Sequence, residues 1–223
     1  LSPLLLGLML LVYTSSSGPV LYRHRRVGYG NRPFNCLKFR TMVVNGDDVL
    51  ERHFQRYPDI RCEWEETRKL QDDPRVTATG HVLRKLSLDE LPQLWNVIRG
   101  DISFVGPRPP LREFTERYPE IYGRVLQDKP GVTGLATLIF NNKEEGLLAR
   151  CSTSEQTDKV YCERCIPAKA RLDLFYQRKA SFGLDLWLIG ATLKQIFSKD
   201  PAGAALHKRK SNARPSVPLL TSS

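Results

Sequence analysis

The chain opens on an apolar segment that carries no charge. Residues 1–13 read LSPLLLGLMLLVY, and TSSSGP and the basic group RHRR at residues 23–26 follow shortly after. As a helix the segment would be about 20 Å long at about 1.5 Å per residue, which is short of the roughly 30 Å hydrocarbon core of a bilayer. It cannot cross a membrane alone, so the fold has to bury it or insert it from one face.

The residues around this segment predict its orientation. The basic group follows it directly, where anionic headgroups and the positive-inside tendency favour cations. Because the first residue is Leu and not Met, we expect the apolar segment to continue upstream. Pro3 would then lie inside a membrane helix and bend it. We predict that residues 1–17 enter and leave the membrane by its cytoplasmic face.

The net charge calls for an anionic partner. The chain has 34 Lys and Arg against 24 Asp and Glu, a net charge of +10. Nucleic acid, an anionic membrane surface and a phosphate-bearing substrate all suit that charge. The five cysteines are an odd number in a chain long enough to need no disulfides, which is typical of a reduced compartment. The CERC spacing at residues 162–165 lacks a second pair of ligands, so we expect thiols there and no zinc site.

The pattern of residues predicts an α+β fold that is mainly helical. Strand-forming residues on both sides of a Gly-rich turn predict a β-hairpin over residues 20–42. Helices are expected over residues 47–70, interrupted at Pro58, and over 111–128 and 182–197, the last apolar almost all round like a buried or membrane-surface helix. Residues 101–110, with three prolines, are expected to be irregular, and residues 129–134 to form a turn.

Two cations of the hairpin fall on one face of its second strand. Lys38 and Arg40 are two residues apart, so their side chains point the same way. They could bind a phosphate together. They could equally be the charges that protect an exposed edge strand.

An acidic pair stands before the apolar run of LSLDELPQLWNV. Ser87 and Glu90 have the spacing of a helix capping box, which would be a purely structural role. That box would place Pro92 inside the helix, where Pro is disfavoured, so the helix is expected to begin at Pro92. Asp89 and Glu90 then precede a helix start, and an ionised Asp can act as a nucleophile while Glu binds a divalent metal. Arg84, Lys85 and Arg108 nearby favour an anionic substrate.

Three motifs in order resemble one family. They are GPVLYRHRRVGYGNRPFNCLKFRTM at residues 18–42, LRKLSLDELPQLWNVIRGDISFVGPRPP at 83–110 and KPGVTGLATL at 129–138. Together they resemble the bacterial sugar transferases, which are monotopic polyprenyl-phosphate phosphoglycosyl transferases. The resemblance implies transfer of a sugar 1-phosphate from a nucleoside diphosphate sugar, usually a UDP-sugar, to polyprenyl (undecaprenyl) phosphate, which initiates lipid-linked glycan or exopolysaccharide assembly.

The resemblance also implies roles for particular residues. Asp89 would attack the sugar-linked phosphate and form a covalent phosphosugar intermediate, and Glu90, with Asp89, would hold Mg²⁺. The cations expected to bind substrate phosphate are Lys38, Arg40, Arg84 and Arg108. Asp173 and Asp185 match acidic positions near the end of the family pattern and are weaker candidates. The family commonly has Gln at His24, so His24 receives no role.

The expected organisation follows from these assignments. Residues 1–17 would be the membrane-inserted segment, 18–198 the catalytic domain, with re-entrant and interfacial helices, and 199–223 a disordered basic tail. The expected location is the bacterial inner membrane, with the catalytic domain on the cytoplasmic face. The expected partners are a UDP-sugar, polyprenyl phosphate and the membrane, with a second copy of the chain as a further possibility and no nucleic acid.

Two non-catalytic functions compete with this interpretation. A nucleic-acid-binding module would need its cations on one continuous face, whereas here they surround an acidic pair. A membrane-associated scaffold that binds lipid headgroups would have no need of Asp89 and Glu90 within a cationic surround.

Overall fold

The computed structural model describes residues 2–58, 60–61, 64, 70, 72–151 and 153–198. The helices are α1 (Ser2–Ser15), α2 (Gly46–Arg56), α4 (Ala78–Lys85), α5 (Gln93–Ile98), α6 (Arg112–Arg117), α7 (Pro119–Val125), α8 (Leu135–Leu148), α9 (Ser154–Val160), α10 (Ile166–Lys179) and α11 (Phe182–Ser198). The strands are β1 (Leu21–Val27), β2 (Pro33–Phe39), β3 (Ser103–Val105) and β4 (Gly131–Thr133). The prediction of a mainly helical fold with a small hairpin is confirmed.

Some predictions fall on the remaining residues. The basic tail at 199–223 lies outside the described residues, as does much of the second half of the predicted 47–70 helix. In the first half of that segment, α2 ends at Arg56.

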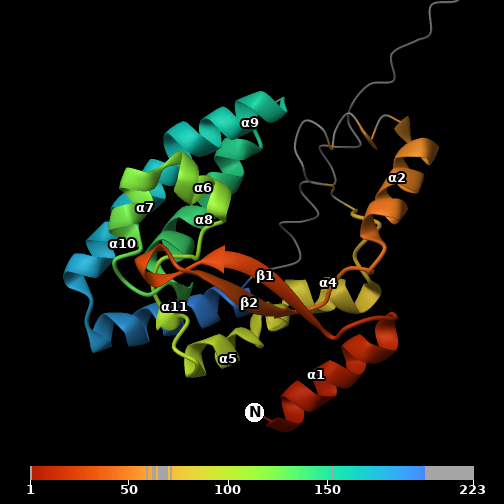
Figure 1. The fold of residues 1–223 in the computed structure, drawn as a ribbon, viewed down its shortest axis with the longest axis horizontal. Helices are drawn as coiled ribbons and strands as arrows, with labels where there is room; N and C mark the ends of the chain where they lie inside the picture. The colour runs from red at the N-terminus through yellow and green to blue at the C-terminus, as the bar shows by residue number, and fades with distance from the viewer. Residues whose placement is uncertain are drawn as a thin grey trace, which may run out of the picture.

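The hairpin runs across the middle of the molecule, between a group of helices that includes α6, α7 and α10 and the α2 and α4 side (Figure 1). Strands β1 and β2 are antiparallel, with His24 opposite Cys36 and Tyr22 opposite Lys38. Gly30 and Asn31 in the turn have φ angles of 61° and 62°. These two residue types tolerate the left-handed conformation better than others, which explains why the chain reverses here.

A second sheet was not expected from the sequence. Strands β3 and β4 pair in parallel, so residues 101–110 and 129–134 each contain a short strand and the predictions of irregular structure and a plain turn were wrong. The prolines that prompted the first prediction lie after β3. Glycine permits the close contact: a Cβ on Gly106 would lie 2.4 Å from the Lys129 carbonyl oxygen, and one on Gly131 would lie 2.2 Å from the Gly106 nitrogen.

The predicted helix over residues 111–128 is two helices. Helix α6 ends before Tyr118, whose φ of −130° is not helical, and α7 begins with Pro119 at its first position. The residue before a proline is biased away from the helical conformation, whereas proline itself suits the first turn of a helix. The break is therefore local in origin.

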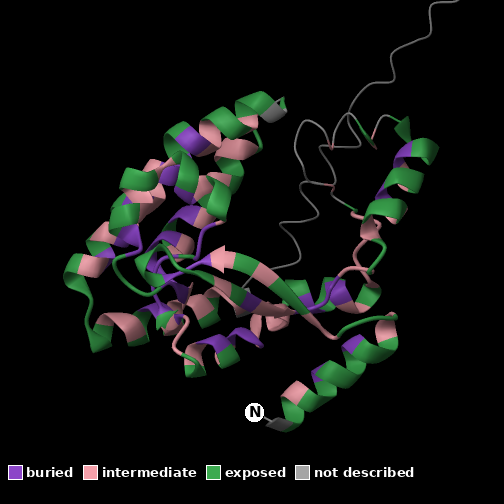
Figure 2. Ribbon diagram, in the orientation of Figure 1, coloured by how far each residue is buried: buried purple, intermediate pink, exposed green. Residues whose placement is uncertain are grey.

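Two apolar clusters hold the elements together. One contains Leu8 and Val12 of α1, Phe39 of β2 and Leu83 of α4. The other contains Val105 of β3, Leu135 of α8, Tyr176 of α10 and Leu188 of α11. Figure 2 shows that most of α1 is exposed apart from the turns that join the first cluster. No helix among the residues the structure describes is both long and apolar enough to span a bilayer.

A buried amide joins helix α5 to the hairpin. Asn96 is 2% exposed, its Oδ1 accepts from the Leu37 N–H at 2.9 Å, and its Nδ2 donates to the Asn35 carbonyl at 2.8 Å. Nδ2 also donates to Asp101 at 3.0 Å. Each atom of the amide is thus used, and the backbone of β2 is fixed relative to the helix that follows the acidic pair.

Replacing Asn96 by Ala should lower the free energy of unfolding by about 2 to 4 kcal/mol, because it empties a buried position and leaves the Leu37 N–H and the Asn35 carbonyl without their side-chain partner. Denaturant unfolding of the detergent-solubilised protein measures this. Asn142→Ala, at an exposed position of α8, is the matched control and should change stability by less than about 0.5 kcal/mol. Equal losses in the two variants would contradict the structural role of Asn96.

Candidate active site

The acidic pair lies on a single 3-10 turn, η2 (Leu88–Glu90), between α4 and α5. Leu88 and Leu91 flank the pair and pack against the cluster formed by α1, β2 and α4. Residues three apart lie on the same side of a 3-10 turn, so the two leucines turn inward together. Asp89 and Glu90 are thereby directed to the cavity described below.

The capping box does not form. Ser87 has a φ of 55°, in the left-handed region, and its side chain makes no cap hydrogen bond. The carboxylate of Glu90 has other partners. Helix α5 starts beside Pro92, as predicted, with Pro92 in its N-cap position. A serine held in the left-handed region is a local cost of the kind that accumulates at functional sites.

Both carboxylates line a cavity of about 1410 Å³ that extends from the hairpin to the C-terminal helices. Its walls include Lys38, Arg40, Arg84, Arg108, His24 and Asp173. The cavity exceeds the 300–1,000 Å³ typical of small-molecule pockets, so it has room for more than one substrate.

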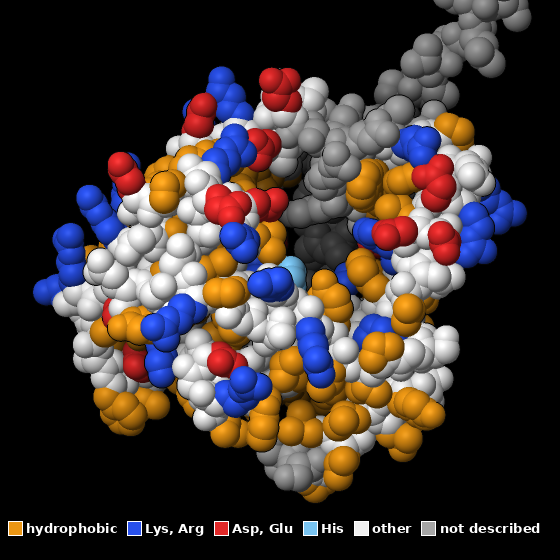
Figure 3. Space-filling model, in the orientation of Figure 1, with side chains coloured by type: hydrophobic (Ala, Val, Ile, Leu, Met, Phe, Trp, Pro, Cys, Tyr) orange, Lys and Arg blue, Asp and Glu red, His pale blue; other side chains and the backbone are white. Residues whose placement is uncertain are grey.

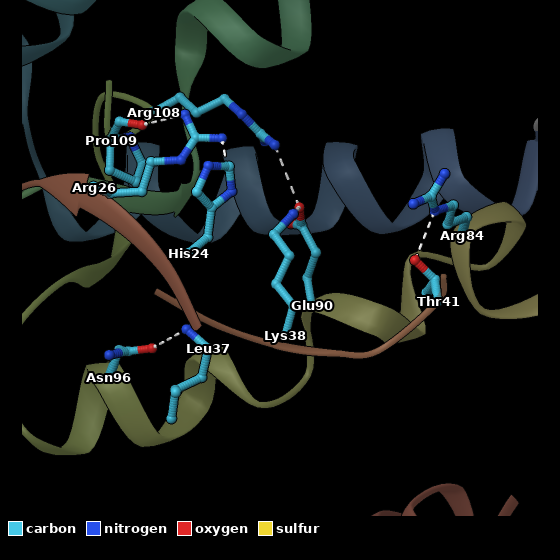
Figure 4. Close-up of polar contacts among 10 residues, drawn as sticks. All are labelled: His24, Arg26, Leu37, Lys38, Thr41, Arg84, Glu90, Asn96, Arg108 and Pro109. Atoms are coloured by element: carbon cyan, nitrogen blue, oxygen red, sulfur yellow. Dashed lines mark hydrogen bonds and ion pairs between the residues drawn. The ribbon is translucent and has the colours of Figure 1, made fainter. Parts of the chain in front are cut away.

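Glu90 is held by two cations from distant parts of the chain. Its Oε1 accepts from Lys38 Nζ at 2.6 Å and from Arg108 at 3.4 Å (Figure 4). Burial by itself would raise the pKa of Glu90, but Arg108 and Lys38 outweigh burial and hold that pKa below its usual range. Glu90 is therefore ionised at neutral pH.

Asp89 has a different electrostatic environment. Burial raises the pKa of its carboxyl, Lys38 and Arg84 oppose the shift, and the neighbouring charge of Glu90 adds to it. A carboxylate with a raised pKa is a stronger base and nucleophile than one neutralised by an ion pair. The two adjacent acids thus differ: Glu90 is paired, and Asp89 is the more basic.

Arg108 lies on a loop that is fixed at several points. Gly106 N–H donates to the Thr133 carbonyl at 2.9 Å, and the Pro107 carbonyl accepts from Gly131 at 2.9 Å. The Val27 N–H donates to the Pro110 carbonyl at 3.1 Å, which attaches the loop to the end of β1. The position of the Arg108 backbone is therefore set by both sheets, whereas its side chain is half-exposed.

Arg84 and Arg40 both line the cavity but have different hydrogen-bond partners. Arg84 donates to Thr41 Oγ1 at 2.9 Å and acts electrostatically on Asp89. Arg40 lines the cavity, but its guanidinium donates to the Pro19 carbonyl at 2.7 Å and to the Ser16 carbonyl and hydroxyl. Lys38 and Arg40 both line the cavity, but Lys38 donates to Glu90, whereas Arg40 turns to the segment after α1.

His24 was given no role from the sequence, yet it lines the cavity next to the cations. Its Nδ1 lies 3.3 Å from the Arg26 guanidinium. Burial, Arg26, Lys38 and Arg108 together lower the pKa of His24 to about 4, so the ring is neutral. The alternation of β1 could have identified it, since Tyr22, His24 and Arg26 share a face of the strand.

The two weaker site candidates, Asp185 and Asp173, lie in different places relative to the cavity. Asp185 accepts from the Tyr176 hydroxyl at 2.5 Å, joins α10 to α11 and is not among the residues that line the cavity. Asp173 does line the cavity and is buried. Burial raises its pKa to about 7, with Lys169 opposing the shift.

The acidic pair fits a divalent cation that is shared with substrate. No group of three or more His, Cys, Asp or Glu side chains able to hold a metal occurs among the described residues. Mg²⁺ in phosphoryl-transfer sites is commonly held by one or two carboxylates, with substrate phosphates and waters completing the shell. Glu90 and Asp89 are the residues that fit this arrangement.

Comparisons with known proteins agree with the motifs. The family model described as Bacterial sugar transferase matches residues 1–199. The exopolysaccharide production protein ExoY of Rhizobium meliloti is 56% identical over 134 residues, 60% of this chain and 59% of that protein.

Two further relatives are longer. The undecaprenyl-phosphate galactose phosphotransferase of Salmonella typhimurium is 49% identical over 60% of this chain and 28% of its own length. The UDP-glucose:undecaprenyl-phosphate glucose-1-phosphate transferase of Escherichia coli is 35% identical over 88% of this chain and 37% of its own length. The chain thus spans about three fifths or less of the length of these three relatives. Because the bacterial sugar transferase model matches residues 1–199, the chain belongs to the bacterial sugar transferase family.

Proposed function

We propose that this chain transfers a sugar 1-phosphate from a UDP-sugar to undecaprenyl or another polyprenyl phosphate, and so initiates lipid-linked glycan or exopolysaccharide assembly. The observation that carries the proposal is the acidic pair on a cavity wall, where Lys38, Arg84 and Arg108 act on its two carboxylates. The names of the relatives from Salmonella and Escherichia coli support the reaction class.

In the first step Asp89 is the nucleophile. A carboxylate oxygen attacks the sugar-linked phosphorus, the bond from that phosphorus to the bridging oxygen breaks, and uridine monophosphate leaves with the bonding electrons. The product on the protein is an aspartyl phosphosugar, a reactive mixed anhydride. Lys38, Arg84 and Arg108 reduce the repulsion between the carboxylate and the diphosphate.

In the second step a polyprenyl phosphate oxygen attacks the phosphorus of the aspartyl phosphosugar. The bond between that phosphorus and the Asp89 oxygen breaks, which releases the polyprenyl diphosphosugar and restores the carboxylate. Arg108 is suited to contact the transferred phosphate in both steps, because its side chain is half-exposed on a fixed loop and lies 3.4 Å from Glu90.

We propose Mg²⁺ as the cofactor, held by Glu90 and Asp89 together with substrate phosphate oxygens. When bound, it would neutralise charge on the transferring phosphoryl group. Lys38 and Arg108 would then fix the orientation of the Glu90 carboxylate.

Replacing Asp89 by Asn should reduce turnover by about 10³-fold or more, because the amide is not a nucleophile. The measurement is uridine monophosphate release with polyprenyl phosphate, Mg²⁺ and a panel of UDP-sugars. Without the acceptor, intact-protein mass should show one sugar phosphate on the wild type and none on the variant. Asp48→Asn, at an exposed position of α2, should behave as wild type. A variant as active as the wild type would exclude Asp89 as nucleophile, and an inactive wild type would favour the scaffold.

Chelation tests the proposed cofactor separately. EDTA should abolish turnover and added Mg²⁺ should restore it. Glu90→Gln should raise the Mg²⁺ concentration for half-maximal rate by about 10-fold or more, since it removes one charged ligand. Full turnover in EDTA would show that the reaction does not use the metal.

We further propose that one apolar side of the molecule lies in the bacterial inner membrane, with the cavity on the cytoplasmic face. Large apolar side chains are exposed on α1, α5 and α11: Leu4, Leu6, Leu10, Leu11, Trp95, Ile98, Phe182, Leu186 and Trp187. Figure 3 shows hydrophobic side chains gathered along the lower edge, where α5 and α1 lie in Figure 1. Exposed apolar area of this extent favours a membrane interface.

The double variant Leu6→Glu, Leu10→Glu tests this placement. The two side chains are 65% and 64% exposed, so charging them should leave the melting temperature unchanged while weakening binding to vesicles with anionic lipid by about 10-fold or more. Co-sedimentation with vesicles is the measurement. Tyr29→Glu, at the exposed hairpin turn, is the control. Unchanged binding by the double variant would place the membrane contact elsewhere.

A further inference from the structure

A second wall of the cavity is built by helices α8 and α10, which come later in the chain than the cations around Glu90. Helix α8 contributes Thr137, Asn141 and Glu144, whose spacing of four and three residues places them on one helix face. Helix α10 contributes Lys169 and Asp173, one turn apart. This wall carries hydroxyl, amide, carboxylate and ammonium groups together, unlike the cationic wall around Glu90.

One carboxyl of this wall has no hydrogen-bond partner among the described residues. Asp173 is 8% exposed, and within the part of the chain that the structure describes its carboxyl has no hydrogen bond. Two nearby acids do have partners: Glu144 of α8 pairs with Lys169, and Asp185 of α11 accepts from the Tyr176 hydroxyl. A largely buried carboxyl with no donor from the protein is uncommon in folded proteins. The Asp173 oxygens are not among the fully buried atoms and face the cavity. In a cavity, a ligand can supply the missing donor.

The charges nearby limit what that ligand can be. Lys169 is paired with Glu144 and lies 5.4 Å from the centre of the Tyr161 ring, so its charge is already engaged. With Asp173 added, this wall holds two acids and one cation, which does not suit a phosphate. In its ionised form Asp173 only accepts hydrogen bonds, so that form requires a donor on the ligand.

We infer that Asp173 accepts a hydrogen bond from a hydroxyl of the donor's sugar and makes this wall of the cavity the part that selects the sugar. The inference rests on the proposed function, which places a UDP-sugar in the same cavity. Sugar hydroxyls donate and accept at once, and Asn141 and Lys169 supply further groups on the same wall. A site built to hydrogen-bond a hydroxyl discriminates strongly against an analogue that lacks it.

The test pairs the residue with the hydroxyl it contacts. The wild type and Asp173→Ala are assayed with the UDP-sugar that the wild type turns over and with its monodeoxy analogues. For the analogue that lacks the hydroxyl contacted by Asp173, kcat/KM of the wild type should be about 10- to 100-fold lower than for the natural UDP-sugar. In Asp173→Ala the same ratio should shrink to about 3-fold or less. Asp48→Ala, outside the cavity, should keep the full penalty.

Inhibition by uridine monophosphate separates the sugar from the nucleoside. It should be equally strong in the wild type and Asp173→Ala, because the monophosphate carries no sugar for Asp173 to contact. Weaker inhibition in the variant would mean that Asp173 contacts the nucleoside and would overturn the inference. An equal loss of kcat/KM with the deoxy analogue in the wild type and in Asp173→Ala would also overturn the inference. It would leave the proposed transferase activity intact. A wild type that turns over no donor would overturn both proposals.

Stability distinguishes a ligand-binding role from a structural one. Since the pKa of Asp173 is raised to about 7 from an unfolded value of 3.8, the folded protein binds more protons between these values and loses stability as pH rises through them. Without substrate, Asp173→Asn should therefore melt at or above the wild-type temperature at pH 8 and at the same temperature near pH 4. A lower melting temperature at both pH values would show that Asp173 is structural and would overturn the inference.

Discussion

Two adjacent carboxylates in a partly buried site repel each other, and the arrangement of this molecule depends on how that repulsion is offset. Lys38 comes from β2, Arg84 from α4 and Arg108 from the loop after β3. No single element could bring three cations to Asp89 and Glu90 from different sides. The hairpin, the short parallel sheet and the α4 to α5 turn therefore have to meet at one place.

Apolar packing fixes the same turn from the other side. Leu88 and Leu91 pack against the cluster that contains Leu8 and Val12 of α1. The helix proposed to lie in the membrane is thus packed on the element that carries the acidic pair. If α1 sets the depth of the protein in the membrane interface, it also sets the depth of Asp89. Asp89 would then lie at the level of the lipid headgroups, where the phosphate of a membrane lipid is found.

The cavity combines two kinds of wall. Around Glu90 the side chains are mainly cationic and suit phosphates, whereas α8 and α10 present mixed polar groups that suit an uncharged hydroxylated molecule. Within one family this division would allow the phosphate chemistry to stay constant while the wall from α8 and α10 varies. It also explains why an unpaired acid such as Asp173 can persist: its cost to folding is offset when a ligand donates to it.

The sequence alone determined the local features of this protein. The hairpin follows from residues that tolerate a tight turn, and the helix start at Pro92 follows from the chemistry of proline. The three motifs identified the family and the acidic pair. Tertiary structure decided which groups meet: it turned Arg40 to Ser16, placed His24 in the cavity and paired Asp185 with Tyr176. Among the described residues, it left the Asp173 carboxyl without a hydrogen bond. It also paired β3 with β4, although the prolines that follow β3 had indicated irregular structure for that segment. Spacing along the chain describes only neighbours within a strand or helix, and contacts between distant segments depend on how those elements pack.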